Sequence, residues 1–446
     1  MKSWHDAARV YFDRRVVVIF FLGFSSGLPL LLVFSTMSVW LKVEGVSLTA
    51  IGLFSLVRTP YALKFLWAPL IDRLPLPVLS KMLGRRRGWA LVTQAALMAA
   101  IFAMSMTGPG VNPAATALFA LLVAFCSASQ DIVIDAYRVE SLDEDQQGAG
   151  AGTIVLGYRV GMLSAGAGAL WLASVLTWPQ VYMVMAALGA VGMITVLCAG
   201  EPRPDVSLTL ADNEEKRIAD HLAAGLPLWS ARGLAWLYEA VIAPFNDFMR
   251  RPGWVAILLF IMLYKLGEAY QGVMANPFYV EMGFSMTEIA AVSKVFGLGA
   301  TLVGALIGGI AVSRYGIMPS LMICGILQIA GILMFCVQAV VGHDVLMLMA
   351  TITAENVTAG MATTAFVAYL SSLCTKAYTA TQYALLSSLM AFARDMLSSS
   401  SGWAAETMGW FGFFIFSAAL AVPGLLVLWW LGRRRPTAQA HFVKGL

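Results

Sequence analysis

The chain has 446 residues, of which 59% are hydrophobic and 12% carry a charge, and its formal net charge is +4. A soluble globular domain carries roughly twice that charged fraction, so this sequence lacks the polar surface of a water-soluble enzyme or binding domain. Lipid must therefore cover most of the molecule. The few basic residues flank the apolar runs and give no indication of nucleic acid as a partner.

Long apolar runs follow one another along the whole chain. A membrane-spanning helix requires about 20 mostly apolar residues, and these runs are too long and too irregular for the alternating strands of a β-barrel. We predict an all-α membrane protein with twelve transmembrane helices, at 16–41, 48–70, 88–107, 113–138, 148–173, 179–199, 253–279, 285–312, 317–341, 345–373, 380–404 and 409–432.

The distribution of charge predicts the orientation of these helices. Basic residues gather in the N-terminal tail, after the second helix, after the sixth helix and in the C-terminal tail, whereas 108–112 and 174–178 carry no charge. By the positive-inside rule both termini are cytoplasmic. We expect two six-helix bundles joined by a cytoplasmic linker with an amphipathic helix on the membrane surface. The expected boundaries are 1–200 and 253–432 for the bundles, 201–252 for the linker, and 433–446 for the cytoplasmic tail.

The two predicted bundles repeat each other in sequence. The segment GVSLTAI at 45–51 precedes the second helix and GFSMTEI at 283–289 precedes the eighth, an offset of 283 − 45 = 238 residues. Arg159 and Arg394 lie in corresponding helices at an offset of 394 − 159 = 235. Two parallel six-helix repeats are the arrangement of major facilitator transporters, whose substrate site lies between the halves near the middle of the membrane.

Several charged residues fall inside the predicted helices. Each costs about 3 kcal/mol or more at membrane depth, so it requires a partner, a water-filled cavity or a function. One interpretation is mutual neutralisation, since Lys265 and Glu268 are three residues apart and can touch on one helix face. Five basic and three acidic residues still leave two positive charges in excess, which favours a cavity for a bulky, polar, anionic solute. These eight residues are Arg58, Arg159, Lys265, Glu268, Lys294, Glu355, Arg394 and Asp395.

A second polar group lies toward the cytoplasmic ends of the second and fourth predicted helices. It comprises Lys64 on the second helix and Gln130, Asp131, Asp135 and Arg138 on the fourth. A contact between Lys64 and Asp131 that forms and breaks would change the proton affinity of the carboxyl group, which is what proton coupling requires. A permanent ion pair that stabilises one conformation explains the same residues.

The loop after the second helix contains a further charged pattern. Asp72-Arg73 and the run Arg85-Arg86-Arg87 partly match the acidic–basic motif that acts as a conformational latch in major facilitator proteins, with a longer spacing here. The alternative interpretation is that these residues only fix the orientation of the chain in the membrane.

Motifs of enzymes and ATP-driven pumps are absent from the sequence. It contains no HExxH pair, no GxSxG turn and no P-loop, and its four histidines are scattered. The five cysteines have no paired spacing, and we expect them to be packing residues. The sequence therefore favours a carrier driven by a gradient, with no cofactor and no metal.

Specific polar motifs within the helices resemble a known family. They are LGFSSGLPL (22–30), KFLWAPLIDR (64–73), SASQDIVIDAYR (127–138), VLGYRVGML (155–163) and ATQYALLS (380–387). These closely resemble the AmpG muropeptide permeases of the bacterial inner membrane. The resemblance implies import of N-acetylglucosaminyl-1,6-anhydro-N-acetylmuramyl peptides from periplasm to cytoplasm, coupled to protons, for peptidoglycan recycling. In some bacteria the imported peptides supply the signal that induces a β-lactamase.

The resemblance and the predicted depths together assign roles to individual residues. Glu268 replaces an aspartate of the family pattern, whereas Arg58 and Asp395 fall where the family carries no charge. We expect the substrate to contact Gln130, Tyr158, Arg159, Lys265, Lys294, Asn356, Gln382 and Arg394. We expect proton coupling to involve Asp131, Glu268, Glu355 and Lys64. We expect the conformational latch to involve Asp72, Arg73, Asp135 and Arg138.

The expected partners are the muropeptide, protons and the lipid bilayer, and the carrier is expected to act as a monomer. Two alternatives stay open. The first is a proton-coupled carrier of another bulky anionic solute, such as an acyl-coenzyme A. The second is a membrane receptor that reports muropeptides through the 201–252 linker without transporting them.

Overall fold

The computed structural model describes residues 10–46, 54–143, 145–202, 207–224 and 226–433. Every regular element in these ranges is a helix, so the prediction of an all-α fold is confirmed. Ten helical segments of the described chain are long and apolar enough to cross a membrane. The number of twelve spans and the cytoplasmic position of both termini stay predictions.

The chain divides into two compact units. Of the described residues, the N-unit comprises Tyr11–Met249 together with Ser371–Ser388, and the C-unit comprises Val10, Arg250–Leu370 and 389–433. We call Ser371–Ser388 the crossover segment. It belongs to the C-terminal half of the sequence but to the N-unit by its contacts.

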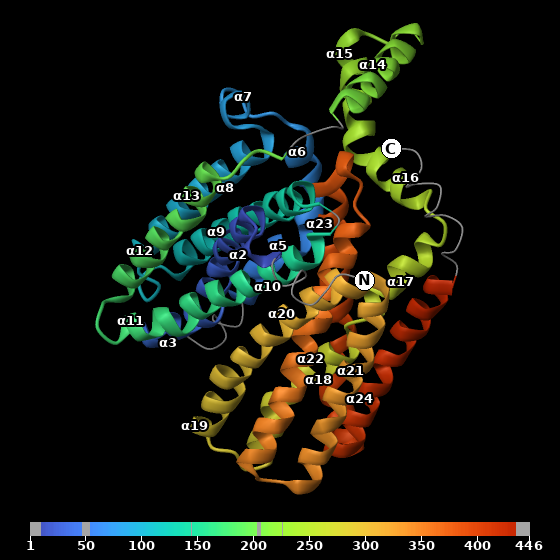
Figure 1. Cartoon of the computed structure of the whole chain (residues 1–446). Helices are drawn as coiled ribbons and strands as arrows, with labels where there is room; N and C mark the ends of the chain where they lie inside the picture. Colours follow the sequence, from blue (N-terminus) through green and yellow to red (C-terminus); the bar gives the residue numbers. More distant parts are fainter. Residues whose placement is uncertain (1–9, 47–53, 144, 203–206, 225, 434–446) are drawn as a thin grey trace. The chain divides into compact units, whose positions relative to one another are not determined.

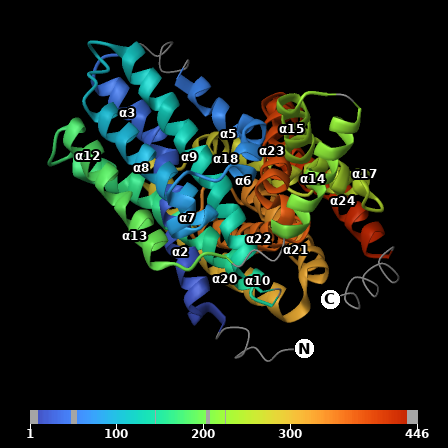
Figure 2. The same cartoon turned by 90° about the horizontal axis from the view of Figure 1, so that it is seen from above.

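The N-unit contains the helices of the first half of the chain. Figures 1 and 2 show these blue to green helices packed side by side as a bundle. The first predicted span is divided, because its first helix ends three residues after Pro29. The longer helices are α2 (Arg14–Leu32), α3 (Ser35–Val43), α8 (Arg85–Ser105), α9 (Pro113–Ser141), α10 (Gln147–Leu163), α12 (Trp178–Leu188) and α13 (Ala190–Cys198).

The second predicted span, 48–70, is not one continuous helix, and this part of the prediction is wrong. Residues 47–53 lie outside the described ranges, and the rest is a series of short helical pieces. Pro60 and Pro69 stand in the first turns of two of these pieces, where a proline begins a helix but cannot continue the preceding one. The pieces are η2 (Phe54–Arg58), α5 (Thr59–Leu63), η3 (Lys64–Leu66) and α6 (Ala68–Arg73).

Helix α10 packs directly on the backbone of α2. Seven glycines lie between 148 and 168, and a Cβ on Gly157 would collide with the carbonyl oxygen of Phe20. Conversely, a Cβ on Gly27 of α2 would collide with the carbonyl oxygen of Tyr158. Small residues permit this close approach and fix the register of the two helices.

Replacing Gly157 by alanine is expected to destabilise the N-unit by about 1–3 kcal/mol, because the methyl group meets backbone that cannot rotate aside. Gly168, at the end of the π-helical segment η4 (Ser164–Gly168), is the matched control. The nearest atom to a Cβ there is the Leu163 carbonyl oxygen at 3.9 Å. Thermal unfolding of both variants in detergent measures the difference. Equal melting temperatures would contradict the tight contact.

The C-unit contains the remaining long helices, and two of them, α22 and α23, pass from one unit to the other. The seventh predicted span is interrupted at Tyr264 and Lys265. Near the end of the chain, Gly409 has a φ of +64° and interrupts α24 where the twelfth predicted span begins. The helices are α17 (Trp254–Leu263), α18 (Leu266–Glu281), α20 (Gly297–Tyr315), α21 (Ile317–Val341), α22 (Val345–Ser372), α23 (Thr379–Leu397) and α24 (Ser401–Arg433), with the π-helical η6 (Ile289–Phe296) before α20.

The predicted linker is itself largely helical. Helices α14 (Ser207–Ala223) and α15 (Leu228–Leu237) lie side by side, as the green hairpin in Figure 1 shows. The π-helical η5 (Tyr238–Ile242) and helix α16 (Ala243–Met249) follow and lead to the C-unit. The position of these helices on a membrane surface stays a prediction.

Candidate functional site

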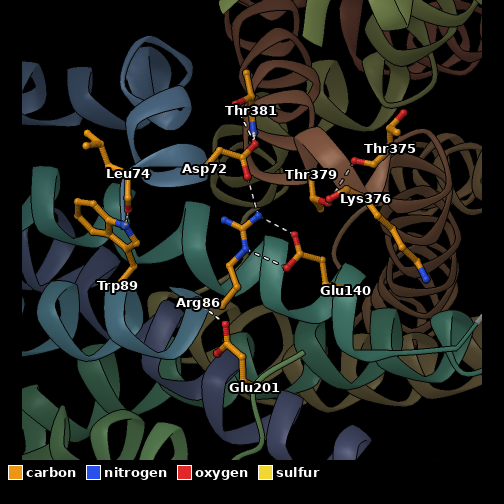
Figure 3. A network of polar contacts seen from close by, with 10 residues as sticks. All are labelled: Asp72, Leu74, Arg86, Trp89, Glu140, Glu201, Thr375, Lys376, Thr379 and Thr381. Atoms are coloured by element: carbon orange, nitrogen blue, oxygen red, sulfur yellow. Dashed lines mark hydrogen bonds and ion pairs between the residues drawn. The ribbon is translucent and has the colours of Figure 1, made fainter. Parts of the chain in front are cut away.

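The best-connected polar site of the N-unit is centred on Arg86, in the first turn of α8 (Figure 3). Its guanidinium donates in a bidentate manner to Glu140, from Nε at 2.9 Å and from Nη2 at 2.6 Å. The same Nη2 lies 2.6 Å from Oδ1 of Asp72. The side chains of Arg86 and Asp72 are only 1% and 2% exposed. One buried guanidinium thus pairs with two carboxylates. This arrangement stabilises the fold only if all three side chains remain in place.

A fourth charged residue, Glu201, joins this site through the backbone. Its two carboxylate oxygens accept hydrogen bonds from the backbone N–H groups of Arg86 at 2.8 Å and Arg87 at 3.0 Å. A carboxylate is favourable at a helix N-terminus, where the N–H groups lack partners within the helix. Gly84 precedes this turn with a φ of +91°, and a Cβ there would collide with the Glu201 side chain.

The end of α13 is fastened in return by basic side chains. Arg87 donates to the carbonyl oxygens of Val196 and Leu197, each at 2.9 Å, and Arg14 donates to that of Cys198 at 2.9 Å. The last carbonyls of a helix have no partners of their own, and cations are favourable there. Several basic residues that the charge pattern assigns to orientation therefore also hold helix ends.

Glu201 lies outside the membrane-spanning segments, and burial raises the pKa of its carboxyl above the ordinary value, although two N–H groups donate to it. The folded state therefore binds this proton more tightly than the unfolded state, and ionisation weakens the fold. Replacing Glu201 by glutamine is expected to raise stability, by an amount that grows as pH rises through the window between the ordinary and the raised pKa.

Replacing Glu201 by alanine removes the acceptor as well and is expected to cost about 0.5–2 kcal/mol. Thermal unfolding of both variants from acidic to neutral pH measures the two effects. A glutamine variant whose advantage shrinks as pH rises would contradict the raised pKa.

Asp72 also reaches the crossover segment. Its second oxygen, Oδ2, accepts from the backbone N–H of Thr381 at 3.1 Å and from the Thr381 hydroxyl at 3.0 Å, at the start of α23 (Figure 3). Asp72 therefore lies between the Arg86 guanidinium and a helix N-terminus, both of which favour a negative charge.

Arg138 makes a second contact with the crossover segment. This fully buried side chain donates from Nη1 to the Ser371 hydroxyl at 2.8 Å and lies 5.3 Å from the centre of the Tyr383 ring. Asp135, one turn earlier on α9, lies 3.7 Å from its Nη2. The fourth predicted latch residue, Arg73, ends α6 and interacts electrostatically with Tyr378.

The predicted proton-coupling group of the N-unit is also assembled. The Ser26 hydroxyl donates to Oδ1 of Asp131 at 2.5 Å. Lys64 is buried and interacts electrostatically with both Asp131 and Asp135. Gln130, next to Asp131, donates to the Ser25 hydroxyl at 3.4 Å. The contact between Lys64 and Asp131 and the role of the two residues stay predictions.

In the C-unit, Lys265 and Glu268 form the ion pair that their spacing predicts. The same Glu268 oxygen accepts from the Gln328 amide, and the Lys265 ammonium donates to the Thr363 hydroxyl at 2.9 Å. Lys265 is the residue at which the seventh span is interrupted, and Glu268 lies in the first turn of α18. The sequence pattern gave no reason to single out Gln328 or Thr363.

The other predicted site residues have varied surroundings. Asn356 accepts from the Thr301 hydroxyl at 2.8 Å, and Glu355 interacts electrostatically with Tyr279. Tyr158 and Arg159 are half-buried on α10 and Arg394 is exposed on α23, whereas the side chains of Lys294 and Asp395 lie outside the described part of the structure. Arg58 lies over the Phe34 ring, 4.9 Å from its centre. Gln382 is buried and bonded to α16 and to Thr375.

A bundle of apolar helices with buried ion pairs and charged contacts at helix ends defines a multi-pass membrane carrier. The sequence pattern of the Major Facilitator Superfamily matches residues 17–394. The solved structure of the proton:xylose symporter XylE has the same fold, with a TM-score of 0.69 at 11% identity over 96% of each chain.

Two curated relatives are much more similar in sequence. The anhydromuropeptide permease of Escherichia coli K12 is 42% identical over 422 residues, which cover 94% of this chain and 80% of the relative. The putative transporter AmpG 4 of Rickettsia felis is 37% identical over 431 residues, which cover 96% of this chain and 98% of the relative. The chain therefore belongs to the Major Facilitator Superfamily and, within it, to the AmpG permease family. It is a transporter and not an enzyme, as predicted.

Proposed function

We propose that this protein imports anhydro-muropeptides, N-acetylglucosaminyl-1,6-anhydro-N-acetylmuramyl peptides, from the periplasm to the cytoplasm across the bacterial inner membrane. The observation that carries this proposal is the 42% identity with an anhydromuropeptide permease over 94% of the chain. Import of this kind would serve peptidoglycan recycling and, where the organism has one, induction of a β-lactamase.

The charged residues support an anionic substrate. Lys265 and Arg159 would pair with carboxylates of the peptide, and arginine can grip a carboxylate with two parallel hydrogen bonds. Arg394 and Lys294 are the corresponding candidates later in the chain. The side chains proposed to hydrogen-bond sugar or peptide groups are Gln130, Tyr158 and Asn356.

Proton coupling is the second part of the proposal. Asp131 is the preferred proton carrier, since it interacts electrostatically with Lys64 and accepts a hydrogen bond from Ser26. Glu268 and Glu355 are the other candidates. Protonation would remove the attraction to lysine and thereby change the relative stability of two access states.

We further propose twelve spans with both termini in the cytoplasm, and a monomer that works by alternating access of its two bundles. In this scheme 1–200 and 253–432 are the bundles, 201–252 is the cytoplasmic linker and 433–446 is the tail. The latch residues Asp72, Arg73, Asp135 and Arg138 would stabilise one access state through their contacts with the crossover segment.

The test is uptake by purified protein in proteoliposomes. A labelled anhydro-muropeptide is expected to accumulate when an inward proton gradient is imposed and to equilibrate without accumulation when the gradient is collapsed. An excess of unlabelled muropeptide should compete, and an acyl-coenzyme A should not. Binding without uptake would indicate the receptor instead, and competition by acyl-coenzyme A alone would indicate a different solute.

A further inference from the structure

Apart from the passage from Val10 to Tyr11 at the start of the described chain, the polypeptide passes between the two units at three places. These are Met249 to Arg250, Leu370 to Ser371 and Ser388 to Leu389. The first crossing follows α16 at the end of the linker, and the other two bound the crossover segment. A movement of the helices of one unit relative to those of the other must therefore be accommodated at these connections.

One carboxylate, that of Asp247, joins the end of the linker to the crossover segment. Its Oδ2 accepts from the Thr375 hydroxyl at 2.7 Å and from the Gln382 amide at 2.9 Å. Asp247 precedes the first crossing by three residues (250 − 247), Thr375 follows the second by five (375 − 370), and Gln382 precedes the third by seven (389 − 382). Asp247 thus joins the end of the linker to two separate positions in the crossover segment.

The Gln382 side chain completes this cluster. Its amide nitrogen also donates to the Pro244 carbonyl oxygen at 3.1 Å, and its amide oxygen accepts from the backbone N–H of Thr375 at 2.8 Å. The side chain is 2% exposed. The amide nitrogen of Gln382 is therefore bonded to the linker and its amide oxygen to Thr375. Together these bonds fix the shape of the crossover segment.

A second contact between the linker and the crossover segment involves Tyr378, three residues after Thr375. Glu239, 2% exposed, accepts from Nε of Arg217 at 2.6 Å and from the Tyr378 hydroxyl at 3.2 Å. The Arg217 guanidinium lies 3.6 Å from the centre of the Tyr238 ring. Helix α14 is thus connected to the crossover segment through a single buried carboxylate.

We propose that Asp247 is a positioning residue: with Gln382 and Thr375 it clamps the crossover segment to the end of the linker, and transport requires this clamp. The proposal rests on the transport function proposed above and adds a role for the linker in it. It also assigns Gln382 to positioning rather than to direct contact with the substrate. Glu239 supports the same arrangement from α14.

Cys374, half-buried and next to Thr375, is a natural reporter of the clamp. The full chain with Cys374 as its only cysteine, purified into nanodiscs, would be labelled with a maleimide. Replacing Asp247 by alanine removes two hydrogen bonds and is expected to raise the labelling rate at least about fivefold, the factor by which the loss of one hydrogen bond shifts an equilibrium. Thr375→Val, which loses the hydroxyl donor but keeps the branched shape, should give a smaller rise if Asp247→Ala does not fold.

Asp220→Asn is the matched control. Asp220 is an exposed linker carboxylate with no side-chain hydrogen bond or ion pair to the described residues, so labelling should stay at the wild-type rate. Uptake by the Asp247→Ala variant should show a reduced maximal rate with little change in KM, because no substrate contact is lost.

An unchanged labelling rate in both Asp247→Ala and Thr375→Val would overturn the clamp. Faster labelling with an unchanged maximal rate would overturn its requirement in transport. The labelling needs no substrate. If the wild-type protein does not carry muropeptides, the proposed function fails while the clamp can still be tested.

Discussion

Replacement of Arg86 by methionine is expected to destabilise the protein by about 3–5 kcal/mol, since it leaves buried carboxylates without their cation. Asp72 and Glu140 are 2% and 11% exposed and both accept from this guanidinium. The variant should fail to accumulate in the membrane or lose uptake. Thermal unfolding of the detergent-purified protein and uptake by proteoliposomes measure these effects.

Two further variants separate charge from packing. Adding Asp72→Asn and Glu140→Gln to Arg86→Met removes the unpaired charges and should recover much of the lost stability. Lys81→Ala, an exposed cation of the same loop, should behave as wild type. If the single Arg86→Met variant unfolds at the wild-type temperature, the ion-pair cluster does not hold the N-unit together.

Replacement of Asp131 by asparagine is expected to abolish the accumulation of muropeptide driven by a proton gradient. The side chain keeps its size and can still accept from Ser26, but it can no longer bind and release a proton. Exchange of labelled for unlabelled substrate without a gradient should continue, because the substrate contacts remain. Parallel measurements of gradient-driven uptake and of exchange distinguish the two steps.

Asp143→Asn is the matched control for Asp131→Asn. Asp143 lies in a surface ion pair with Arg15, with a side chain 73% exposed, and exposed pairs of this kind contribute about 1 kcal/mol or less. Full accumulation by Asp131→Asn would transfer the coupling role to Glu268 or Glu355. Loss of exchange as well would show that Asp131 is needed for substrate movement itself.

Features determined by local sequence were predictable. The all-α fold follows from the long apolar runs, and the pairing of Lys265 with Glu268 follows from their spacing on one helix face. The loop after the second predicted helix was recognisable as a latch candidate because Asp72-Arg73 and Arg85-Arg86-Arg87 partly match the acidic–basic motif of major facilitator proteins.

Features determined by packing between distant segments were not predictable. Glu140 and Glu201 lie at helix ends, where an acidic residue is unremarkable, and only the folded chain brings them to Arg86. The family resemblance predicts a substrate contact for Gln382, whereas in the structure its amide donates to the linker residue Asp247, 135 residues earlier (382 − 247 = 135). The broken second span is different, because its cause is local: Pro60 and Pro69 are visible in the sequence, and a reading of hydropathy alone overlooks them.

The two carboxylate oxygens of Asp72 have different partners, and this bears on whether its contact with the crossover segment can break and form again. Oδ1 lies on the Arg86 guanidinium, and Oδ2 accepts from Thr381. If the crossover segment moves away, the carboxylate keeps its cation, and water can replace the two hydrogen bonds to Thr381. No charge is left stranded in an apolar interior, and no proton needs to be supplied. The hydrogen bonds between Asp72 and Thr381 can therefore break and form again while the ion pair of Asp72 with Arg86 stays intact.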